Sequence, residues 1–234
     1  MKPIDFFPRF NTLTKNDLKV DFHLHSTWTD GKNTVEEIIQ TAKEYGLHSI
    51  AITDHIREES TYFEAYKKEI DRLNSESDMN IYVGFEAKIS DFVGNIDVKK
   101  EEAEAADIAV VSVHRYPLGN RLYTASEFTK NIAQEIEFEL SIAALKGGGF
   151  NVLGHPGGMS LTHFKEFPLD FYEEIITECI KNEIAFDLNG RYHQHQIDIL
   201  YPLLQKHNPF VAIGTDSHNI NRMGRWNKDL QEYI

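Results

Sequence analysis

The sequence predicts an α/β fold in which seven parallel strands close into a (β/α) barrel. Short apolar runs rich in β-branched residues alternate with longer amphipathic runs along the chain, and such alternation is typical of parallel sheets with right-handed crossovers. His, Asp or Glu side chains end six of the seven predicted strands. An open sheet gathers its functional residues at one crevice, whereas a barrel collects them from many strand ends at one mouth. The spread over six strands therefore favours a barrel.

Each predicted element rests on its own local pattern. Strands are predicted where apolar runs are short, at residues 18–25, 48–55, 79–87, 107–114, 150–155, 183–190 and 209–218. Helices are predicted at residues 34–45, 60–75, 98–105, 124–146, 169–182 and 193–206, with a last short one after 218. Thr34 with Glu37, and Thr124 with Glu127, have the spacing of capping boxes. The glycines at 147–149 end the long helix.

Length and composition limit the classes of protein that are compatible with the chain. Its 234 residues, 41% hydrophobic and 26% charged, are typical of a globular protein and fit one barrel domain over 1–234, with a core at about 18–218. A single cysteine, Cys179, excludes an intrachain disulfide and a thiolate zinc site. The net charge of −13 argues against non-specific binding to nucleic acid or to anionic membranes. The N-terminus has no long apolar run, so we expect a cytoplasmic protein; the oligomeric state is not indicated.

The first predicted strand ends in a pair of histidines, His23 and His25. Side chains two positions apart on a strand point to the same side, which would place both imidazoles over the barrel mouth. A second pair with this spacing, His193 and His195, shows that spacing alone is weak evidence. The first pair differs in its context, because it lies at a strand end and Asp30 follows in the loop.

Further polar side chains end later strands. They are His55 in TDH, Glu86 in GFE, His114 in SVH, His155 in GHPGG, and Asp216 and His218 in TDSH. A lone histidine at a strand end is more often a packing or surface residue. Packing or surface roles do not readily explain six His, two Asp and one Glu that all lie at strand ends. If they were buried together without cations, nothing would compensate the cost of removing them from water.

The sequence therefore predicts two or three divalent metal ions, because nine ligands exceed what one ion needs. A set of His and carboxylate ligands without thiolate suits Zn, Mn or Fe and does not choose among them. Three such ions bring +6 against −3 from three carboxylates. The surplus favours a hydroxide together with an anionic substrate, and a phosphate monoester fits it better than a neutral amide.

The motifs HLHSTWTDG, TDH, GFE, SVH, GHP and TDSH resemble those of the PHP (polymerase and histidinol phosphatase) family, over residues 20–218. The resemblance implies a distorted, seven-stranded (β/α)7 TIM-like barrel with a trinuclear metal site. It groups the ligands as His23, His25, Glu86 and Asp216; as Glu86, His114 and His155; and as Asp30, His55 and His218. It also implies a phosphatase in which a metal-bound hydroxide attacks a phosphate ester, with Glu86, Asp216 and His218 taking part in catalysis.

Several functions stay open at this stage. Histidinol phosphate or another small phosphomonoester is the first expectation, and a nucleotide or oligonucleotide phosphoesterase of the same family is the alternative. A C–N or lactone hydrolase of the amidohydrolase type usually needs a lysine on the fourth strand, and 107–114 has none. A metal-stabilised scaffold without activity would be expected to have lost ligands.

Three arginines are candidates for binding the substrate phosphate, because the guanidinium fork matches phosphate geometry. Arg191 at the end of the sixth strand is the first choice, followed by Arg115 after His114 and Arg57 after His55. Each is alternatively a solvated loop charge. His193 and His195 are expected on the helix surface, and Trp28 either stacks on a substrate ring or packs over its loop.

Overall fold

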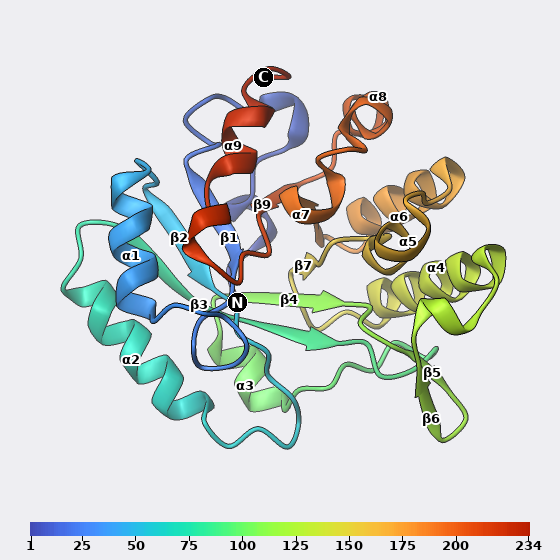
Figure 1. Cartoon of the computed structure of the whole chain (residues 1–234), viewed down its shortest axis with the longest axis horizontal. Coiled ribbons are helices and arrows are strands. Elements are labelled where there is room, and N and C mark those ends of the chain that lie inside the picture. The colour runs from blue at the N-terminus through green and yellow to red at the C-terminus, as the bar shows by residue number, and fades with distance from the viewer.

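A computed structural model describes all residues, 1–234. Seven parallel strands form one sheet in the order β1-β2-β3-β4-β7-β8-β9 (Figure 1). They are β1 (Val20–Leu24), β2 (Ser49–Ile52), β3 (Asn80–Lys88), β4 (Ile108–Ser112), β7 (Val152–Leu153), β8 (Ala185–Asn189) and β9 (Val211–Gly214). The predicted α/β class and the seven-stranded barrel are confirmed, and each predicted strand overlaps one of these, with β3 ending one residue beyond its predicted range.

The sheet closes into a barrel where the ends of its first and last strands meet. The amide of His25 donates to the carbonyl of Ser217 at 3.0 Å, and Leu24 forms a parallel bridge with Ser217. The buried carboxylate of Asp21 accepts hydrogen bonds from the amide and hydroxyl of Thr215, at 3.0 and 2.6 Å. Asp21 and Thr215 therefore fasten the start of β1 to the chain directly after β9.

Helices cover the outside of the barrel, with α1 and α2 on the left of Figure 1 and α4, α5 and α6 on the right. The longer ones are α1 (Val35–Glu44), α2 (Phe63–Ser75), α4 (Lys130–Gly147), α6 (Leu169–Lys181) and α8 (Ile197–His207). The shorter ones are α3 (Lys100–Ala105), α5 (Gly158–Phe164), α7 (Gly190–His193) and α9 (Arg225–Leu230). In α6 the residues Tyr172, Ile175, Ile176 and Cys179 are buried, which is the spacing of one helix face. No helix combines the length and apolar character that a membrane span requires.

The region between β4 and α4 differs from the prediction of one helix over 124–146. Thr124 and Glu127 do form a capping box, but it closes only the 3-10 turn η3 (Ala125–Glu127). Phe128 and Thr129 are extended, and α4 begins at Lys130. An antiparallel hairpin precedes it, β5 (Tyr116–Leu118) with β6 (Arg121–Tyr123). A capping box satisfies the first turn only, so it does not fix how far a helix continues.

Two further boundaries differ from the prediction. The helix expected at 193–206 begins at Ile197 as α8, and a separate helical turn, α7, precedes it from Gly190, where the side chain of Asn189 accepts from the amide of Arg191. The short helix α5 after GHPGG was not predicted, since its seven residues carry no clear amphipathic period. The chain after β9 continues through η4 (Ile220–Arg222) to α9, which confirms the predicted short helix.

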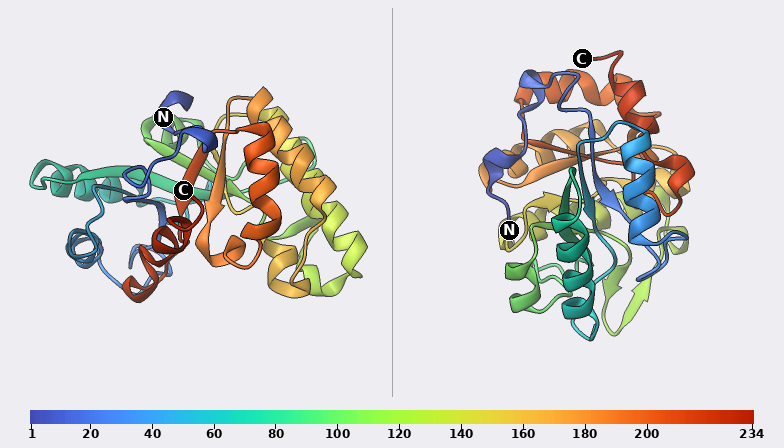
Figure 2. Two further views of the ribbon diagram at one scale, coloured as in Figure 1. Left: turned by 90° about the horizontal axis from the view of Figure 1, so that it is seen from above. Right: turned by 90° about the vertical axis from the view of Figure 1, so that its left-hand side faces the viewer.

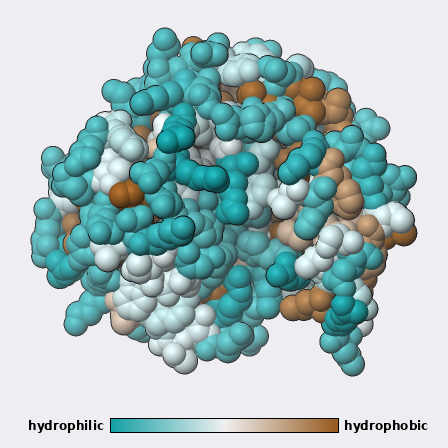
Figure 3. All heavy atoms as spheres, in the orientation of Figure 1, coloured by the Kyte–Doolittle hydropathy of each residue, from teal (hydrophilic) through white to brown (hydrophobic).

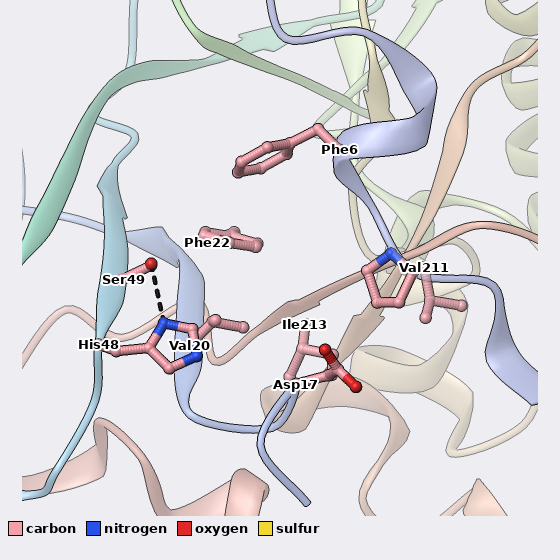
Figure 4. A pocket seen from close by; sticks show the side chains of 9 residues that line it. Phe6, Asp17, Val20, Phe22, His48, Ser49, Val211 and Ile213 are labelled. Carbon is pink, nitrogen blue, oxygen red and sulfur yellow. Dashed lines mark hydrogen bonds between the residues drawn. The ribbon is translucent and has the colours of Figure 1, made fainter. Parts of the chain in front are cut away.

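The N-terminal segment, with η1 (Ile4–Phe6) and η2 (Phe10–Thr12), runs across the opposite end of the barrel, as the dark blue chain in Figure 2 shows. The amide of Lys2 donates to the carbonyl of Asp107 just before β4, and the amide of Val211 donates to Pro8. A cavity of about 130 Å³ lies at this end, and Figure 4 shows Phe6 and Phe22 over it. The aromatic segment therefore covers the end of the barrel away from the polar strand ends.

Candidate metal centre

Glu86 of β3 lies at the centre of the predicted ligands and is buried. Its Oε1 lies 3.1 Å from Nε2 of His114 and 2.9 Å from Nε2 of His155. Its Oε2 lies 3.5 Å from Nε2 of His25 and 3.2 Å from Nδ1 of His55. The two oxygens therefore face different imidazoles, which is the arrangement expected of a bridging carboxylate.

Asp216, after β9, faces the two histidines of β1. Its Oδ1 lies 3.1 Å from Nε2 of His25 and 3.8 Å from Nε2 of His23. Glu86 Oε1 lies 3.4 Å from the same His23 nitrogen. Strands β1 and β3 and the chain after β9 thus supply one compact group of potential ligands.

A third group surrounds Asp30, whose side chain is 54% exposed. Its Oδ2 lies 3.4 Å from Nε2 of His55 and 3.2 Å from Nε2 of His218, and its Oδ1 lies 3.7 Å from Nδ1 of His25. The structure thus brings all nine predicted ligands together. In four sets of three or four residues the ligand atoms lie within 4.8 Å of one another: His25, Asp30, His55 and His218; His23, His25 and Asp216; His23, Glu86 and His155; and His55, Glu86 and His114.

The buried imidazoles are better placed to bind metal ions than to hydrogen-bond with other protein groups. Nε2 of His23, both ring nitrogens of His25 and Nδ1 of His114 are buried without a hydrogen-bond partner. Unpartnered buried nitrogens are costly, and a cation offers each lone pair a partner. No thiolate is near, so the donors are those that Zn, Mn and Fe accept.

Burial and neighbouring charges shift the pKa values of the proposed ligands. Burial alone would raise the pKa of the Glu86 carboxyl, but the imidazoles of His114 and His23 hold it well below its usual value. Burial lowers the pKa of His25, which favours the neutral ring that a metal ligand requires. Glu86 and His25 are thereby available as lone-pair donors, whereas nearby carboxylates outweigh burial and raise the pKa of His23, His155 and His218.

Two of these residues have a strained backbone. His155 has a φ of 29° and Asp216 a φ of 48°, in the left-handed region that residues with a Cβ rarely adopt. Strain of this kind persists only where the surrounding structure imposes it, and it clusters at functional sites. The turn after His155 adds Gly157 at φ 80°, where a Cβ would meet the hydroxyl of Tyr172 at 2.8 Å.

Asp187 of β8 supports the site and was missed in the sequence. Its buried Oδ2 lies 2.9 Å from Nδ1 of His23, and it accepts from the amide of His155 at 3.1 Å and from Nδ2 of Asn189 at 2.9 Å. Such a carboxylate fixes the orientation and tautomer of a ligating imidazole. A lone Asp within the apolar run AFDL is the signal that sequence reading should have used.

Asp54, in the TDH motif, organises the loop that carries Asp30. It accepts hydrogen bonds from the amide and hydroxyl of Ser26 and from the amide and hydroxyl of Thr29. Four donors from one loop fold that loop around a single buried carboxylate. Its role depends on contacts with residues 25 to 28 positions away, so the local sequence pattern does not reveal it beyond a carboxylate beside an apolar run.

The three candidate arginines differ in their distance from the ligands. Arg191 Nη1 lies 2.8 Å from Oδ2 of Asp216, and its side chain is 42% exposed at the mouth. Arg57 lies 3.4 Å from Nδ1 of His55 through Nη2, but its Nη1 donates to the carbonyls of Ile56 and Glu86 and so holds the backbone. Arg115 is exposed and contacts only the carbonyl of His114. Arg191 is therefore the best placed of the three.

The expectations for His193, His195 and Trp28 can also be compared with the structure. His193 is buried, not on the surface as expected: its Nδ1 accepts from the amide of Asn189 and its Nε2 donates to the carbonyl of Pro156. Burial lowers its pKa to about 4, so it is neutral at pH 7. His195 is exposed, as expected. Trp28 stacks on Tyr62 at 5.8 Å, which favours packing over the loop.

Comparison with known proteins agrees with the fold and the site. The model of the PHP domain matches residues 21–191. A "Probable phosphatase" of Caldicellulosiruptor bescii is 27% identical, covering 89% of this chain and 83% of the relative. A "Probable phosphatase" of Caldicellulosiruptor saccharolyticus is 28% identical, covering 92% and 88%.

A solved structure of a "putative histidinol phosphatase" from Listeria monocytogenes matches with a TM-score of 0.69 and 18% identity, covering 92% of this chain and 100% of that one. At this identity the likeness supports the fold alone. The family model spans most of the chain, from the strand that carries His23 to Arg191. The chain therefore belongs to the PHP domain family, the metal-dependent phosphoesterases that its motifs resemble.

Proposed function

We propose that this PHP-family enzyme hydrolyses a small phosphate monoester, using two or three divalent ions held by the nine clustered side chains. The observation that carries the proposal is the position of Glu86, whose two oxygens each face different imidazoles within 3.5 Å. A buried carboxylate in this position suits adjacent cations. The names of the two bacterial relatives support a phosphatase.

The residues that would hold the ions are those grouped above. Glu86 and Asp216 would bridge or orient neighbouring ions, and Asp30, His55 and His218 would hold the most exposed one. Bound divalent cations supply positive charge to phosphoryl oxygens and acidify nearby water. Zn, Mn and Fe all suit this donor set.

The chain itself orients the substrate. Arg191 presents its guanidinium at the mouth, beside Asp216, where it would bind the oxygens of the phosphate. The buried carboxylate of Asp187 holds His23 in place, so this ligand would not need to reorganise when the substrate enters. The first substrates to test are p-nitrophenyl phosphate, histidinol phosphate and nucleoside monophosphates.

The alternative C–N hydrolase lacks support in the structure. Strand β4 consists of IAVVS and offers no lysine to bridge two metals. Asp30 and His55 lie 3.4 Å apart inside the cluster and would have no role in such a site. The phosphoesterase proposal accounts for both residues.

The test compares His155→Ala and Asp216→Ala with wild type on p-nitrophenyl phosphate after loading with Zn, Mn or Fe. We expect kcat/KM to fall by about 100-fold or more in each variant, because outer contacts alone are worth 10–100-fold. Metal content and circular dichroism separate loss of ligands from loss of fold. His163→Ala, which removes an exposed histidine of α5, is the matched control. Wild-type activity in either ligand variant would disprove the proposal.

A further inference from the structure

A cleft beside the metal centre is lined by cationic and polar side chains. It consists of two adjoining hollows of about 330 and 420 Å³ that share Arg191, His195 and Arg222. Arg225 lines the first hollow and Lys165 the second. Figure 3 shows hydrophilic side chains over the surface formed by α7 and α9. We call this region the basic cleft.

The charge of the basic cleft is opposite to that of the molecule. The chain carries 37 acidic against 24 basic residues, yet no Asp or Glu lines either hollow. Two carboxylates touch the lining from outside it: Asp216 pairs with Arg191, and Asp229 accepts from Gln194. Arg222 and Arg225 form no ion pair, whereas many other cations of the chain do.

The basic cleft opens directly beside the proposed ligands. Arg191 lines both hollows and contacts Asp216 at 2.8 Å. Tyr192 lines the second hollow, and its ring centroid lies 4.5 Å from that of His155. Thr215 lines the first hollow and directly precedes Asp216. A ligand with one end among the metal-binding residues would therefore extend its other end into the cleft.

We propose that the basic cleft binds a second phosphate group of the substrate, so that the enzyme prefers small bisphosphorylated molecules. This inference rests on the proposed phosphatase activity and specifies its substrate class. Arginine is the side chain best matched to phosphate, and Arg222 and Arg225 have no acidic partner to displace. The same cations repel a leaving group that carries an ammonium, as histidinol phosphate does. A hollow of about 330 Å³ is large enough for part of a small organic ligand.

The test measures kcat/KM of the metal-loaded enzyme on two matched pairs. One pair is fructose 6-phosphate and fructose 1,6-bisphosphate, and the other is a nucleoside 5′-monophosphate and its 3′,5′-bisphosphate. We expect the bisphosphate to be preferred in at least one pair. In Arg222→Ala and in Arg225→Ala, the ratio of kcat/KM for the bisphosphate to kcat/KM for the monophosphate falls by about tenfold relative to wild type. This is the loss expected when one charged hydrogen bond to the second phosphate is removed. Lys68→Ala, an exposed cation of α2 without an ion pair, keeps the wild-type ratio.

A binding measurement separates this inference from the proposed function. Calorimetry with the same bisphosphates on protein treated with a chelator reports the basic cleft without turnover, and we expect weaker binding in Arg222→Glu than in wild type. Binding that depends on Arg222 together with no hydrolysis of any ester would end the phosphatase proposal and keep the anion site. Three results would each overturn the inference. The first is equal kcat/KM for both members of each pair, and the second is an unchanged ratio in both alanine variants. The third is a preference for histidinol phosphate or for oligonucleotides.

Discussion

His155 and Asp216 show how single residues are constrained by the site. Each has a positive φ, which costs on the order of 1 kcal/mol or more for a residue with a Cβ. Neighbouring contacts hold both in place, because the amide of His155 donates to Asp187 and the carboxylate of Asp216 pairs with Arg191. The strained backbone directs the imidazole of His155 and the carboxylate of Asp216 to positions that a regular strand end would not give them.

A prediction at this scale concerns Asp187, which orients His23. Asp187→Ala removes the acceptor for Nδ1 of His23 at 2.9 Å, so we expect metal affinity to fall by about 10–100-fold. Metal titration of the chelator-treated protein measures the effect. Asp187→Asn keeps an oxygen acceptor and is expected to lose less affinity. Equal affinity in wild type and Asp187→Ala would show that His23 needs no such support.

The residues that sequence analysis found and missed differ in the range of their contacts. His25, His55, His114 and the other proposed ligands follow strand ends, and the periodicity of the chain locates those ends. Asp54 and Asp187 act on residues 25 or more positions away, and no local pattern encodes that partnership. Their only local signal is a carboxylate within or beside an apolar run.

At the scale of elements, the order of strands and helices was predictable but several boundaries were not. Helix α1 agrees with the prediction because its capping box is fully formed at Thr34 and Glu37. The same spacing at Thr124, directly after the hairpin β5–β6, closed only a 3-10 turn, because the chain is extended at Phe128 and Thr129 before α4 begins. Such breaks are set by how neighbouring elements pack, which local propensity does not specify.

Helix α5 is held against α4 by Glu137, and a prediction tests this contact. The buried carboxylate accepts from the amides of Met159 and Ser160 and from the Ser160 hydroxyl. Glu137→Ala leaves those donors unpaired, so we expect a loss of about 1–3 kcal/mol in the free energy of unfolding. Denaturant unfolding of the variant measures it. Glu139→Ala on the exposed face of the same helix is the control, and equal losses in both would contradict the assignment.

In the whole molecule, histidines and carboxylates lie together at one end of the barrel, and apolar residues cover the other end. Six histidines and three carboxylates meet at the carboxyl ends of the strands, while aromatic residues such as Phe6 and Phe7 cover the other end. The buried imidazole nitrogens without partners reduce the stability of the metal-free fold. Stability and metal binding are therefore expected to be linked.

This linkage gives a prediction for the melting temperature. Chelation should lower Tm, and saturating Zn or Mn should restore it, because a ligand at 100 times its Kd stabilises the native state by about 2.7 kcal/mol. Differential scanning calorimetry with and without metal measures the change. The ligand variant His155→Ala should respond less than wild type. A Tm that is independent of metal in the wild type would contradict the expected occupancy.

The seam between β1 and β9 has a consequence for how the protein is made. His23 and His25 leave the ribosome early, but the backbone partner Ser217 and the side chains of Asp216 and His218 emerge almost 200 residues later. A nascent chain that has not reached these residues cannot close the ring, and it lacks a ligand in the two sets that contain Asp216 or His218. We therefore expect the full set of cations to bind only after synthesis of the barrel is complete, so that these ions would stabilise the finished fold rather than start its folding.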